Sequence, residues 1–405
     1  MTKKLYDEDA CLLEFSGAVL SCIYNRKKQL YEVILDQTAF FPEEGGQLPD
    51  RGYLDQEPVL DVQLNPDPAS GQDTIVHMVK HPFEPGSRVI GRIDWRCRFD
   101  QMQQHSGEHI ISGLVHKHYH YNNVGFHLGE EEVTLDFDGP LTLQQLREIE
   151  REANQAVKEN LEVRVYFPDA QTLSTLEYRS KIAISGAVRI VEIPGCDVCA
   201  CCAPHVARTG QIGLIKITNV QSHRGGVRVN ILCGDRALAD YTRKQDSVSS
   251  ISVQLSAKPD QVSEAVERLR GENARLREQI CSLQAALMQE KISHLPSAKE
   301  SDHAILFAEE LDAIAARNTA NLLADTYKGW GAVLVGSDET GYRYVIASRH
   351  LDCRELASRL RERFQAKGGG SSEMIQGTLN IHGKDFETWL TNTTSEPSSN
   401  TQASY

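Results

Sequence analysis

The spacing of apolar and polar residues over residues 1–92 is typical of β structure. Short runs rich in β-branched residues recur along this stretch, and turn-favouring Gly, Pro and Asp residues separate them. The runs cover residues 18–24, 31–35, 59–64 and 74–79. A loop with two phenylalanines and two adjacent glycines lies between them, at residues 38–47. The pattern predicts a small N-terminal β-barrel.

The pattern becomes mixed over residues 93–242. Residues 99–119 have helical spacing, and Thr142 begins a second predicted helix in which Gln145 is placed to complete a capping box. Strand-like runs follow at residues 163–167, 188–193, 212–217 and 227–232. This mixture of helices and strands predicts a separate α+β domain.

Residues 243–296 read as a linker followed by a coiled-coil helix. After Pro259, apolar residues alternate at spacings of four and three. In heptad register, the a positions are Val266, Asn273, Ile280 and Leu287, and the d positions are Val262, Leu269, Leu276 and Leu283. Such a and d residues favour a parallel two-stranded coil, so we expect a homodimer. The alternative is a single long helix that folds back on its own chain.

The remaining pattern predicts a C-terminal α/β domain over residues 297–390. A helical stretch at 302–324 precedes strands at 331–335 and 344–347, an arginine-bearing helix and a glycine-rich loop at 368–377. Residues 391–405 are rich in Ser, Thr and Asn and are predicted to be disordered. The chain as a whole is therefore expected to be an α+β multidomain protein.

Composition places the chain among globular proteins. Its hydrophobic content is 40% and its charged content is 24%, and no apolar run is long enough to cross a bilayer. The first residues lack the apolar core of a signal peptide. These features predict a cytoplasmic protein with no membrane association, in which the ten cysteines are reduced.

The net charge of −13 argues against indiscriminate binding to nucleic acid, although a localised basic face remains compatible with it. Two basic clusters occur along the chain. The first contains Arg92, Arg96 and Arg98, and the second contains Arg354, Arg359, Arg361, Arg363 and Lys367. Clusters of this kind are usually solvated helix faces, so the pattern alone makes neither of them a binding site.

Two short motifs carry metal-ligand side chains. His105 and His109 lie four positions apart on a predicted helix, so their rings lean to the same side. Cys201 and His205 have the same spacing in a loop marked by Pro204. Three imidazoles and one thiolate form a donor set that suits tetrahedral Zn2+. The two motifs together predict a zinc site that joins distant parts of the chain.

Two other interpretations of these motifs remain open. Cys196, Cys199 and Cys202 have the spacing of a zinc knuckle and could hold a separate structural ion. His105-Ser-Gly-Glu-His109 also matches the inverted zincin motif, in which Glu108 would be the general base of a metallopeptidase. The peptidase hypothesis leaves Cys201 and His205 without a role.

The segments around both motifs resemble a known family. Residues 94–109, Asp94-Trp-Arg-Cys-Arg-Phe-Asp-Gln-Met-Gln-Gln-His105-Ser-Gly-Glu-His109, are similar to the opening of the editing domain of alanyl-tRNA synthetases and their free-standing AlaX relatives. Residues 197–213 resemble the second zinc motif of that family, and residues 38–47 its glycine-rich motif. Residues 368–377 resemble the end of the C-terminal DHH-associated domain. The resemblance covers nearly the whole chain and lacks the aminoacylation domain.

The resemblance implies a long AlaX-type enzyme that hydrolyses mischarged Ser-tRNA(Ala), with Gly-tRNA(Ala) as a further candidate. Such editing is needed because an alanine-sized pocket rejects serine only weakly. The implied cofactor is Zn2+, held by His105, His109, Cys201 and His205. Glu108 is the best local base, and its alternative role is a salt bridge to a neighbouring arginine. The implied substrate-binding residues are Thr38, Gly45, Gly46, Gln47 and Asn123. The implied tRNA-binding residues are Arg354, Arg359, Arg361, Arg363 and Lys367.

The chain departs from the family pattern at three places. Cys202-Ala203-Pro204 stands where the family usually has Gly-Gly-Thr, and Glu44 replaces the first of three glycines. Asn123 lies nearest the place of a threonine that senses the substrate side chain in the family. The first departure suggests an alternative function, in which the chain is a zinc-stabilised tRNA-binding protein without hydrolysis.

Overall fold

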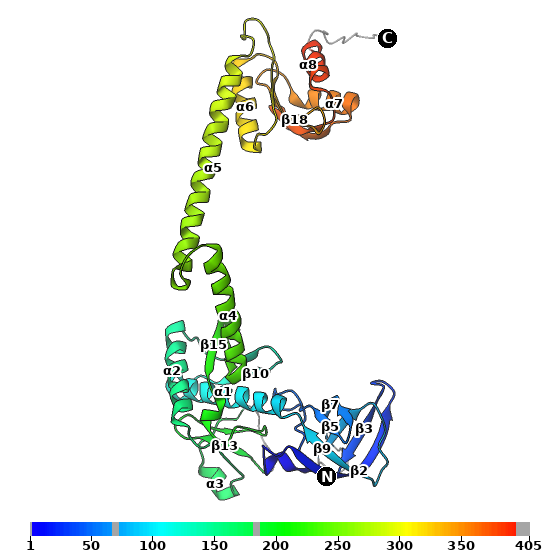
Figure 1. The fold of residues 1–405 in the computed structure, drawn as a ribbon, viewed down its shortest axis with the longest axis vertical. Helices are drawn as coiled ribbons and strands as arrows, with labels where there is room; N and C mark the ends of the chain where they lie inside the picture. Colours follow the sequence, from blue (N-terminus) through cyan, green and yellow to red (C-terminus); the bar gives the residue numbers. More distant parts are fainter. Residues whose placement is uncertain (1, 67–72, 181–186, 394–405) are drawn as a thin grey trace, which may run out of the picture. The chain divides into compact units, whose positions relative to one another are not determined.

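The computed structural model describes residues 2–66, 73–180 and 187–393 (Figure 1). The chain divides into two compact units, Met1–Ser250 and Ile251–Tyr405. The boundary expected between residues 92 and 93 lies inside the first unit. Over the described residues, the helices are all too short or too polar to cross a membrane. The fold is a mixed α and β architecture with several sheets, as the sequence pattern predicts.

The chain begins with a strongly curved, barrel-like sheet of seven strands in the order β6-β5-β9-β2-β3-β8-β7. Its strands are β2 (Glu14–Asn25), β3 (Leu30–Leu35), β5 (Gly52–Leu54), β6 (Glu57–Val59), β7 (Asp61–Pro66), β8 (Asp73–Val79) and β9 (Arg88–Ile93). Inward-facing residues such as Val33, Leu54 and Phe40 form its core. Two short strands, β1 (Lys3–Lys4) and β4 (Gln37–Thr38), pair beside it, and the short helix η1 (Leu5–Asp7) follows β1.

A long helix, α1 (Trp95–Tyr119), leads from this sheet toward α2 (Leu143–Glu159), as Figure 1 shows. Asp94 caps α1 by accepting a hydrogen bond from the Cys97 amide. At the start of α1, Arg98 is fully buried and donates to the carboxylate of Asp50, with 2.9 Å between Arg98 Nε and Asp50 Oδ1. Arg98 also donates to the carbonyls of Ala10 and Ala39. Arg98 therefore ties α1 to the first sheet and is no part of a solvated basic face.

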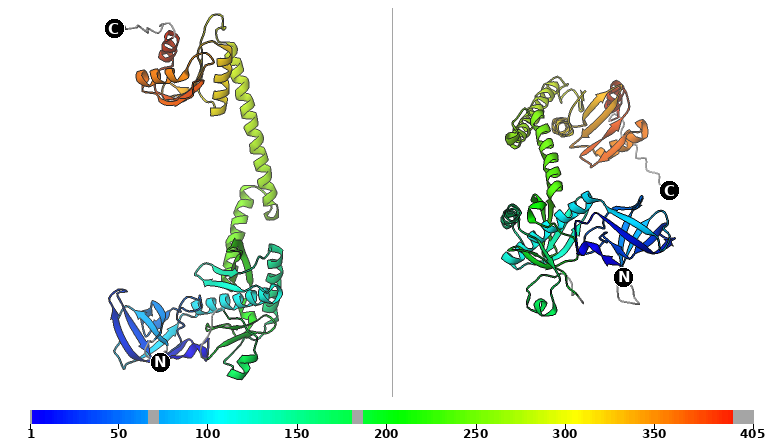
Figure 2. Two further views of the ribbon diagram at one scale, coloured as in Figure 1. Left: turned by 180° about the vertical axis from the view of Figure 1, so that it is seen from behind. Right: turned by 60° about the horizontal axis from the view of Figure 1, so that its bottom comes forward.

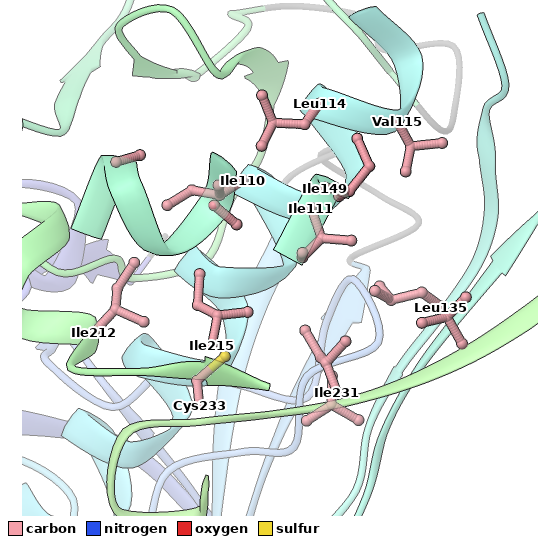
Figure 3. Close-up of a cluster of buried hydrophobic side chains, with 14 of the residues drawn as sticks. Ile110, Ile111, Leu114, Val115, Leu135, Ile149, Ile212, Ile215, Ile231 and Cys233 are labelled. Carbon is pink, nitrogen blue, oxygen red and sulfur yellow. The ribbon is translucent and has the colours of Figure 1, made fainter. Parts of the chain in front are cut away.

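An antiparallel sheet in the order β10-β11-β16-β15 packs against α1 and α2. Its strands are β10 (Asn123–Leu128), β11 (Val133–Phe137), β15 (Ile215–His223) and β16 (Gly226–Cys233). Figure 3 shows the core between these layers, where Ile110 and Ile111 of α1 meet Ile149 of α2 and Ile231 of β16. The predicted capping box of Thr142 and Gln145 is present at the start of α2.

A third sheet leads directly into the second metal-ligand motif, which follows its last strand. It contains β12 (Arg164–Tyr166), β13 (Ile190–Ile193) and β14 (Asp197–Ala200) in sequence order. The motif was expected directly after the strand near Val188, but a further strand, β14, intervenes because residues 190–200 form a hairpin. Two short helices complete this region, α3 (Ala170–Thr175) and η2 (Thr209–Ile212). Figure 2 gives two further views of these elements.

The segment after β16 is helical where the sequence suggested a linker. Helix α4 spans Gly234–Gln254 and so includes residues 243–254. Its charged residues form ion pairs one turn apart, such as Lys244 with Asp240 at 2.6 Å, and pairs of this spacing stabilise a helix whose surface is largely polar. The linker prediction was wrong for these residues because a polar helix has a weak hydrophobic period.

The second unit contains the predicted heptad helix, α5 (Val262–Ser293), which follows the short helix η3 (Pro259–Gln261). Most of its a and d side chains are exposed, including Leu276 and Ile280, which are about half exposed. Only Ala265 and Met288 of α5 are buried among the described residues. The apolar stripe therefore does not fold back onto its own unit, apart from the end near Met288, which joins the core beneath α6.

The C-terminal region is a five-stranded sheet in the order β17-β18-β19-β21-β20, with helices on both faces. Its strands are β17 (Ala304–Ala308), β18 (Gly331–Ser337), β19 (Gly341–Ala347), β20 (Lys367–Gly370) and β21 (Met374–Leu379). Its helices are α6 (Ala313–Thr326), α7 (Cys353–Phe364) and α8 (Gly383–Asn392). Val333 and Val335 of β18 face the core with α6, whereas Ala332 and Leu334 face the core with α7 and α8.

Three details of the C-terminal prediction differ from the structure. Residues 304–308 form a strand and not the start of the predicted helix. The prediction failed there because the spacing of a short apolar run does not distinguish a helix from a strand. The glycine-rich residues 368–377 form part of the β20–β21 hairpin, where a Cβ on Gly368 would lie 2.2 Å from the Gln376 carbonyl oxygen. Thr391 and Asn392 belong to α8, Thr393 caps its end, and residues 394–405 of the predicted disordered tail lie outside the described residues.

Candidate metal centre and its cavity

The middle of α1 presents polar side chains to the interior of the first unit. Every residue from Gln101 to Val115 is buried, and this stretch includes His105, Glu108 and His109. A polar side chain loses hydration when it is buried, so each one needs a partner inside the protein. Gln104, for example, exchanges two hydrogen bonds with the backbone of Cys233. The buried polar stretch of α1 therefore indicates a preorganised functional site.

The four predicted metal ligands converge on one point. The ligand atoms of His105, His109, Cys201 and His205 all lie within 4.8 Å of one another. The Cys201 sulfur lies 3.6 Å from Nε2 of His105 and 3.4 Å from Nε2 of His205. A tetrahedral zinc ion bonded to one nitrogen and one sulfur would hold those two atoms about 3.6 Å apart, given usual Zn–N and Zn–S lengths. The donor spacing therefore fits zinc.

Each imidazole has a second partner on its other ring nitrogen. The Nδ1 atom of His105 lies 2.7 Å from Gln47 Oε1, and that of His109 lies 2.8 Å from Asp197 Oδ2. The third, on His205, lies 3.0 Å from the Ser106 hydroxyl. Such contacts fix the orientation and tautomer of metal-binding histidines. All three rings can therefore direct Nε2 at the common centre.

The charges around the donors favour a bound cation. Burial raises the pKa of the Cys201 thiol, but the imidazoles of His105 and His205 outweigh burial and hold it well below its ordinary value. Burial lowers the pKa of His205 to about 3, so that ring is uncharged at physiological pH. His109 is also buried, but its hydrogen bond to Asp197 and its contact with Cys201 raise its pKa well above the ordinary value. A metal ion would take the place of that proton.

The alternative knuckle of three cysteines is not assembled in the described part of the chain. Cys199 lies with His109 and Asp197 in a second possible donor group. This group is not independent of the first, because His109 is a donor in both and Asp197 is the hydrogen-bond partner of His109. Neither Cys196 nor Cys202 joins a donor group there. Burial is the main cause that raises the pKa of both thiols. These cysteines are therefore poorer metal ligands than Cys201.

The metal centre opens onto a cavity of about 540 Å³. The carboxyl side chain of Glu108 lines this cavity beside the donors, and Phe126 and Phe167 provide apolar walls. A cavity of this size and lining is typical of small-molecule sites. A polar substrate group could therefore reach the donors and Glu108 at the same time.

Two neighbours hold the Glu108 carboxylate. Its Oε1 atom accepts hydrogen bonds from the Ser112 hydroxyl at 2.7 Å and from the Asn123 amide at 2.6 Å. Its Oε2 atom lies 3.8 Å from Nε2 of His109. The Asn123 amide also donates to Ser112, and its carbonyl oxygen accepts from the Gly125 amide. Asn123 therefore positions Glu108, and its predicted contact with substrate stays a prediction.

The other predicted substrate-binding residues have different surroundings. Gly45 lines the cavity. Gly46 lies at φ +85, and a Cβ there would lie 2.5 Å from the Phe126 carbonyl oxygen, so it allows the loop to approach β10 closely. Gln47 supports His105 as described above. Thr38 is fully buried, and its hydroxyl bonds to His77 at 2.8 Å, outside the residues that line the cavity.

Four supporting residues received no role from the sequence. Ser106 and Asp197 bond to the ligand imidazoles, and Arg179 holds Asp197 through two hydrogen bonds of 2.7 and 2.8 Å. Arg189 donates to the carbonyls of Cys201 and Ala203 and so holds the ligand loop. Asp197 begins β14 on the same face as the buried Cys199, and an aspartate at the start of an apolar strand is a usable signal for a buried carboxylate.

The predicted tRNA-binding residues lie in the second unit and are all exposed. Arg354, Arg359, Arg361 and Arg363 are on α7, whereas Lys367 begins β20, so the expected single helix ends before Lys367. Arg354 is paired with Asp352 at 2.6 Å, which offsets part of its charge. The exposed positions are compatible with contacts to phosphate, and tRNA binding by these residues stays a prediction.

Two family models match parts of the chain. Residues 188–229 match the "Threonyl and Alanyl tRNA synthetase second additional domain", a stretch that contains β13, β14 and both ligands of the second motif. Residues 17–97 match "tRNA synthetases class II (A)", and this stretch is the barrel-like sheet. The first match thus contains Cys201 and His205, and the second contains Gln47, the partner of His105, whereas His105 and His109 lie between the two matches.

Individual relatives resemble most of the chain. The alanyl-tRNA editing protein Aarsd1-A of Xenopus laevis is 29% identical over 86% of this chain and 85% of its own length. The rat protein Aarsd1 is 27% identical over 92% and 93%, respectively. The alanine--tRNA ligase of Ignicoccus hospitalis is 30% identical over 74% of this chain, which spans only about a third (33%) of the ligase. This chain is therefore similar to alanyl-tRNA editing proteins along nearly the whole of both sequences.

Proposed function

We propose that this chain is a zinc-dependent aminoacyl-tRNA hydrolase that removes the wrong amino acid from tRNA(Ala). The observation that carries the proposal is the four-donor centre, which opens onto a cavity shared with the Glu108 carboxylate. The named function of the editing relatives supports the same conclusion. The substrate would be the ester between serine, or glycine, and the 3′-terminal adenosine.

The residues on the cavity wall suggest how the ester is cleaved. Glu108 would accept a proton from a water molecule, and the oxygen of that water would attack the ester carbonyl. The ester C–O bond then breaks, and the departing adenosine oxygen takes up a proton that Glu108 can return. The products are the free amino acid and tRNA with a free terminal hydroxyl. Ser112 and Asn123 hold one Glu108 oxygen, and the other lies beside the donors, 3.8 Å from Nε2 of His109.

The four donors define what a bound zinc ion could contribute. Zinc would supply positive charge that positions and polarises the carbonyl or the amino acid of the substrate. With His105, His109, Cys201 and His205 all bonded, a four-coordinate site has no free position. We therefore assign activation of the water to Glu108. Asp197, Gln47 and Ser106 keep the three rings in place throughout.

The function is tested by deacylation of purified tRNA(Ala) charged with serine or with alanine. We expect the wild-type protein to hydrolyse Ser-tRNA(Ala) at a rate well above that of Ala-tRNA(Ala), because editing must spare the correct product. Binding of tRNA(Ala) without hydrolysis of either ester would instead support the tRNA-binding alternative. Cleavage of peptides that depends on Glu108 would support the peptidase alternative.

We also propose that two chains associate through α5 and bind tRNA with their C-terminal domains. The exposed apolar stripe of α5, which includes Leu269, Leu276 and Leu283, has the spacing of a two-stranded coil. A parallel pair would place two copies of the basic α7 surface next to each other. Basic contacts to phosphate would make tRNA affinity fall as salt concentration rises, even for an acidic protein.

The Leu276→Pro variant tests the association. Proline inside a helix removes a hydrogen bond and costs about 3 kcal/mol or more, so α5 should break and the protein should become monomeric. We expect light scattering to show a dimer for the wild type and a monomer for the variant, with weaker tRNA binding. Arg277→Ala, at an exposed position outside a and d, should keep the dimer. A monomeric wild type at micromolar concentration would contradict the coiled coil.

A further inference from the structure

One wall of the metal cavity carries polar groups for which the fold provides no partner. Tyr6, on η1, is only 2% exposed, and its hydroxyl has no hydrogen-bond partner among the described residues. One carboxylate oxygen of Glu44, Oε2, is also buried and unpartnered in that part of the chain. Both side chains line the same cavity as Glu108 and the metal donors. A third atom on this wall, Arg189 Nε, also makes no hydrogen bond among the described residues, but it lies 3.3 Å from the Asp7 carboxylate and is paired by charge. Buried polar groups without partners are costly, so the oxygens of Tyr6 and Glu44 in one cavity indicate a ligand group that is recognised there.

The surroundings define the chemistry of that ligand group. A carboxylate only accepts hydrogen bonds. Burial raises the pKa of the Tyr6 phenol far above its ordinary value, and nearby Asp7 and Glu44 add to the effect, so the phenol stays neutral. Its oxygen can therefore accept a hydrogen bond beside the Glu44 carboxylate. A ligand group that satisfies both oxygens must donate hydrogen bonds, and positive charge on it would strengthen the bond to Glu44.

The cations of the protein itself do not occupy this position. Arg189 lies 3.3 Å from Asp7, and its guanidinium donates to the carbonyls of Cys201 and Ala203. Lys4 also lines the cavity, but it makes no ion pair with Glu44 among the described residues. The thiol of Cys202 interacts with the Glu44 carboxylate and holds it beside the ligand loop. Glu44 thus presents negative charge to whatever enters the cavity.

We propose that Glu44 and Tyr6 form a subsite for the α-ammonium group of the aminoacyl ester, which holds the ester carbonyl toward Glu108 and the metal donors. The inference rests on the proposed function and adds to it the group of the substrate that the protein recognises, the α-ammonium group. Glu44 lies on the glycine-rich loop, where Gly45 comes within contact distance of Cys202: a Cβ on Gly45 would lie 3.6 Å from the Cys202 sulfur. The loop therefore brings the carboxylate to the metal centre, and the subsite distinguishes aminoacyl from α-hydroxyacyl esters.

The experiment compares two esters on the same tRNA. Ser-tRNA(Ala) is assayed beside the product of its nitrous-acid deamination, in which a hydroxyl replaces the α-amino group. Each rate is divided by the uncatalysed rate of the same ester, because the amino group also changes intrinsic lability. For the wild-type protein we expect kcat/KM to be about 10- to 100-fold lower for the α-hydroxy ester, which is the range for loss of a hydrogen bond to a charged group.

Variants then assign the discrimination to residues. Glu44→Gln keeps the size of the side chain but removes its charge, and should lower kcat/KM for the seryl ester about 10- to 100-fold while leaving the α-hydroxy ester nearly unchanged. Tyr6→Phe should change the same ratio in the same direction by a smaller factor. Glu43→Gln is the matched control, because Glu43 is exposed on the same loop and bonds to Gln63. Zinc content should be equal in all four proteins.

Two results would overturn the subsite. One is equal corrected rates for the two esters with the wild-type protein, which would leave the editing function intact. The other is a Glu44→Gln variant, with its zinc retained, that loses the same factor on both esters. Hydrolysis of neither ester by the wild type would remove the proposed function itself and the subsite with it. These outcomes are distinct, so the two conclusions can fail separately.

Discussion

The His105→Ala/Cys201→Ala double variant is expected to be isolated without zinc and without measurable deacylation of Ser-tRNA(Ala). The two substitutions remove one donor from each motif, so the two remaining imidazoles are too few for a structural or catalytic zinc site. The wild-type protein should contain one zinc per chain, and a chelator should remove both the metal and the activity. Metal analysis and the deacylation assay on the same preparations provide the measurement.

Graded variants distinguish the four-donor centre from the other cysteines. Cys196→Ala/Cys202→Ala leaves the four donors in place and should keep one zinc per chain. Asp197→Asn weakens the support of His109 and should lower zinc affinity about 10- to 100-fold, as loss of such a partner does in other zinc sites. Full zinc content in the His105→Ala/Cys201→Ala protein, with loss of zinc from the Cys196→Ala/Cys202→Ala protein, would assign the metal to the cysteine knuckle.

Glu108→Gln is expected to lower the deacylation rate by about two orders of magnitude or more while zinc is retained. General acid–base catalysis typically contributes a factor of 10² to 10⁴, and glutamine cannot accept the proton of the attacking water. The substituted side chain keeps its size, and its carbonyl oxygen can still accept from Ser112 and Asn123. The fold and the metal site should therefore be preserved, so that kcat falls more than KM changes.

The control for Glu108 is Ser112→Ala, which removes one of the two hydrogen bonds to its carboxylate without removing the base. We expect a smaller loss of rate, since Asn123 still holds Glu108 at 2.6 Å. A Glu108→Gln protein with wild-type activity and normal zinc would mean that Glu108 has only a structural role. In that case another group near the donors would have to activate the water.

Features that depend on neighbours in sequence could be predicted from the sequence. The pairs His105/His109 and Cys201/His205 each place two donors one helical turn or one short loop apart, and the structure brings the pairs together. The capping box at Thr142 and the start of α5 after Pro259 depend on local chemistry in the same way. Spacing within a segment was sufficient for these features.

Features that depend on tertiary contacts could not be predicted. Gln47 and Asp197 reach the ligand histidines from 58 and 88 residues away, respectively, and only the fold reveals these contacts. Arg98 belonged to a basic cluster in the sequence, but its buried bond to Asp50 makes it a core residue. The assignment of Asn123 to substrate followed a family position, whereas its bond to Glu108 depends on how β10 packs against α1.

The contacts between the barrel-like sheet and α1 limit where the gene could be divided. A polypeptide that began at Trp95 would keep all four metal ligands and Glu108, yet it would lack Gln47, the partner of His105, and Asp50, the partner of Arg98. The same truncation would remove Ala10 and Ala39, whose carbonyls also accept from Arg98, so the buried start of α1 would be exposed to water and His105 would lose its partner. Recombination that transfers the metal site to another protein must therefore transfer the barrel-like sheet and α1 together.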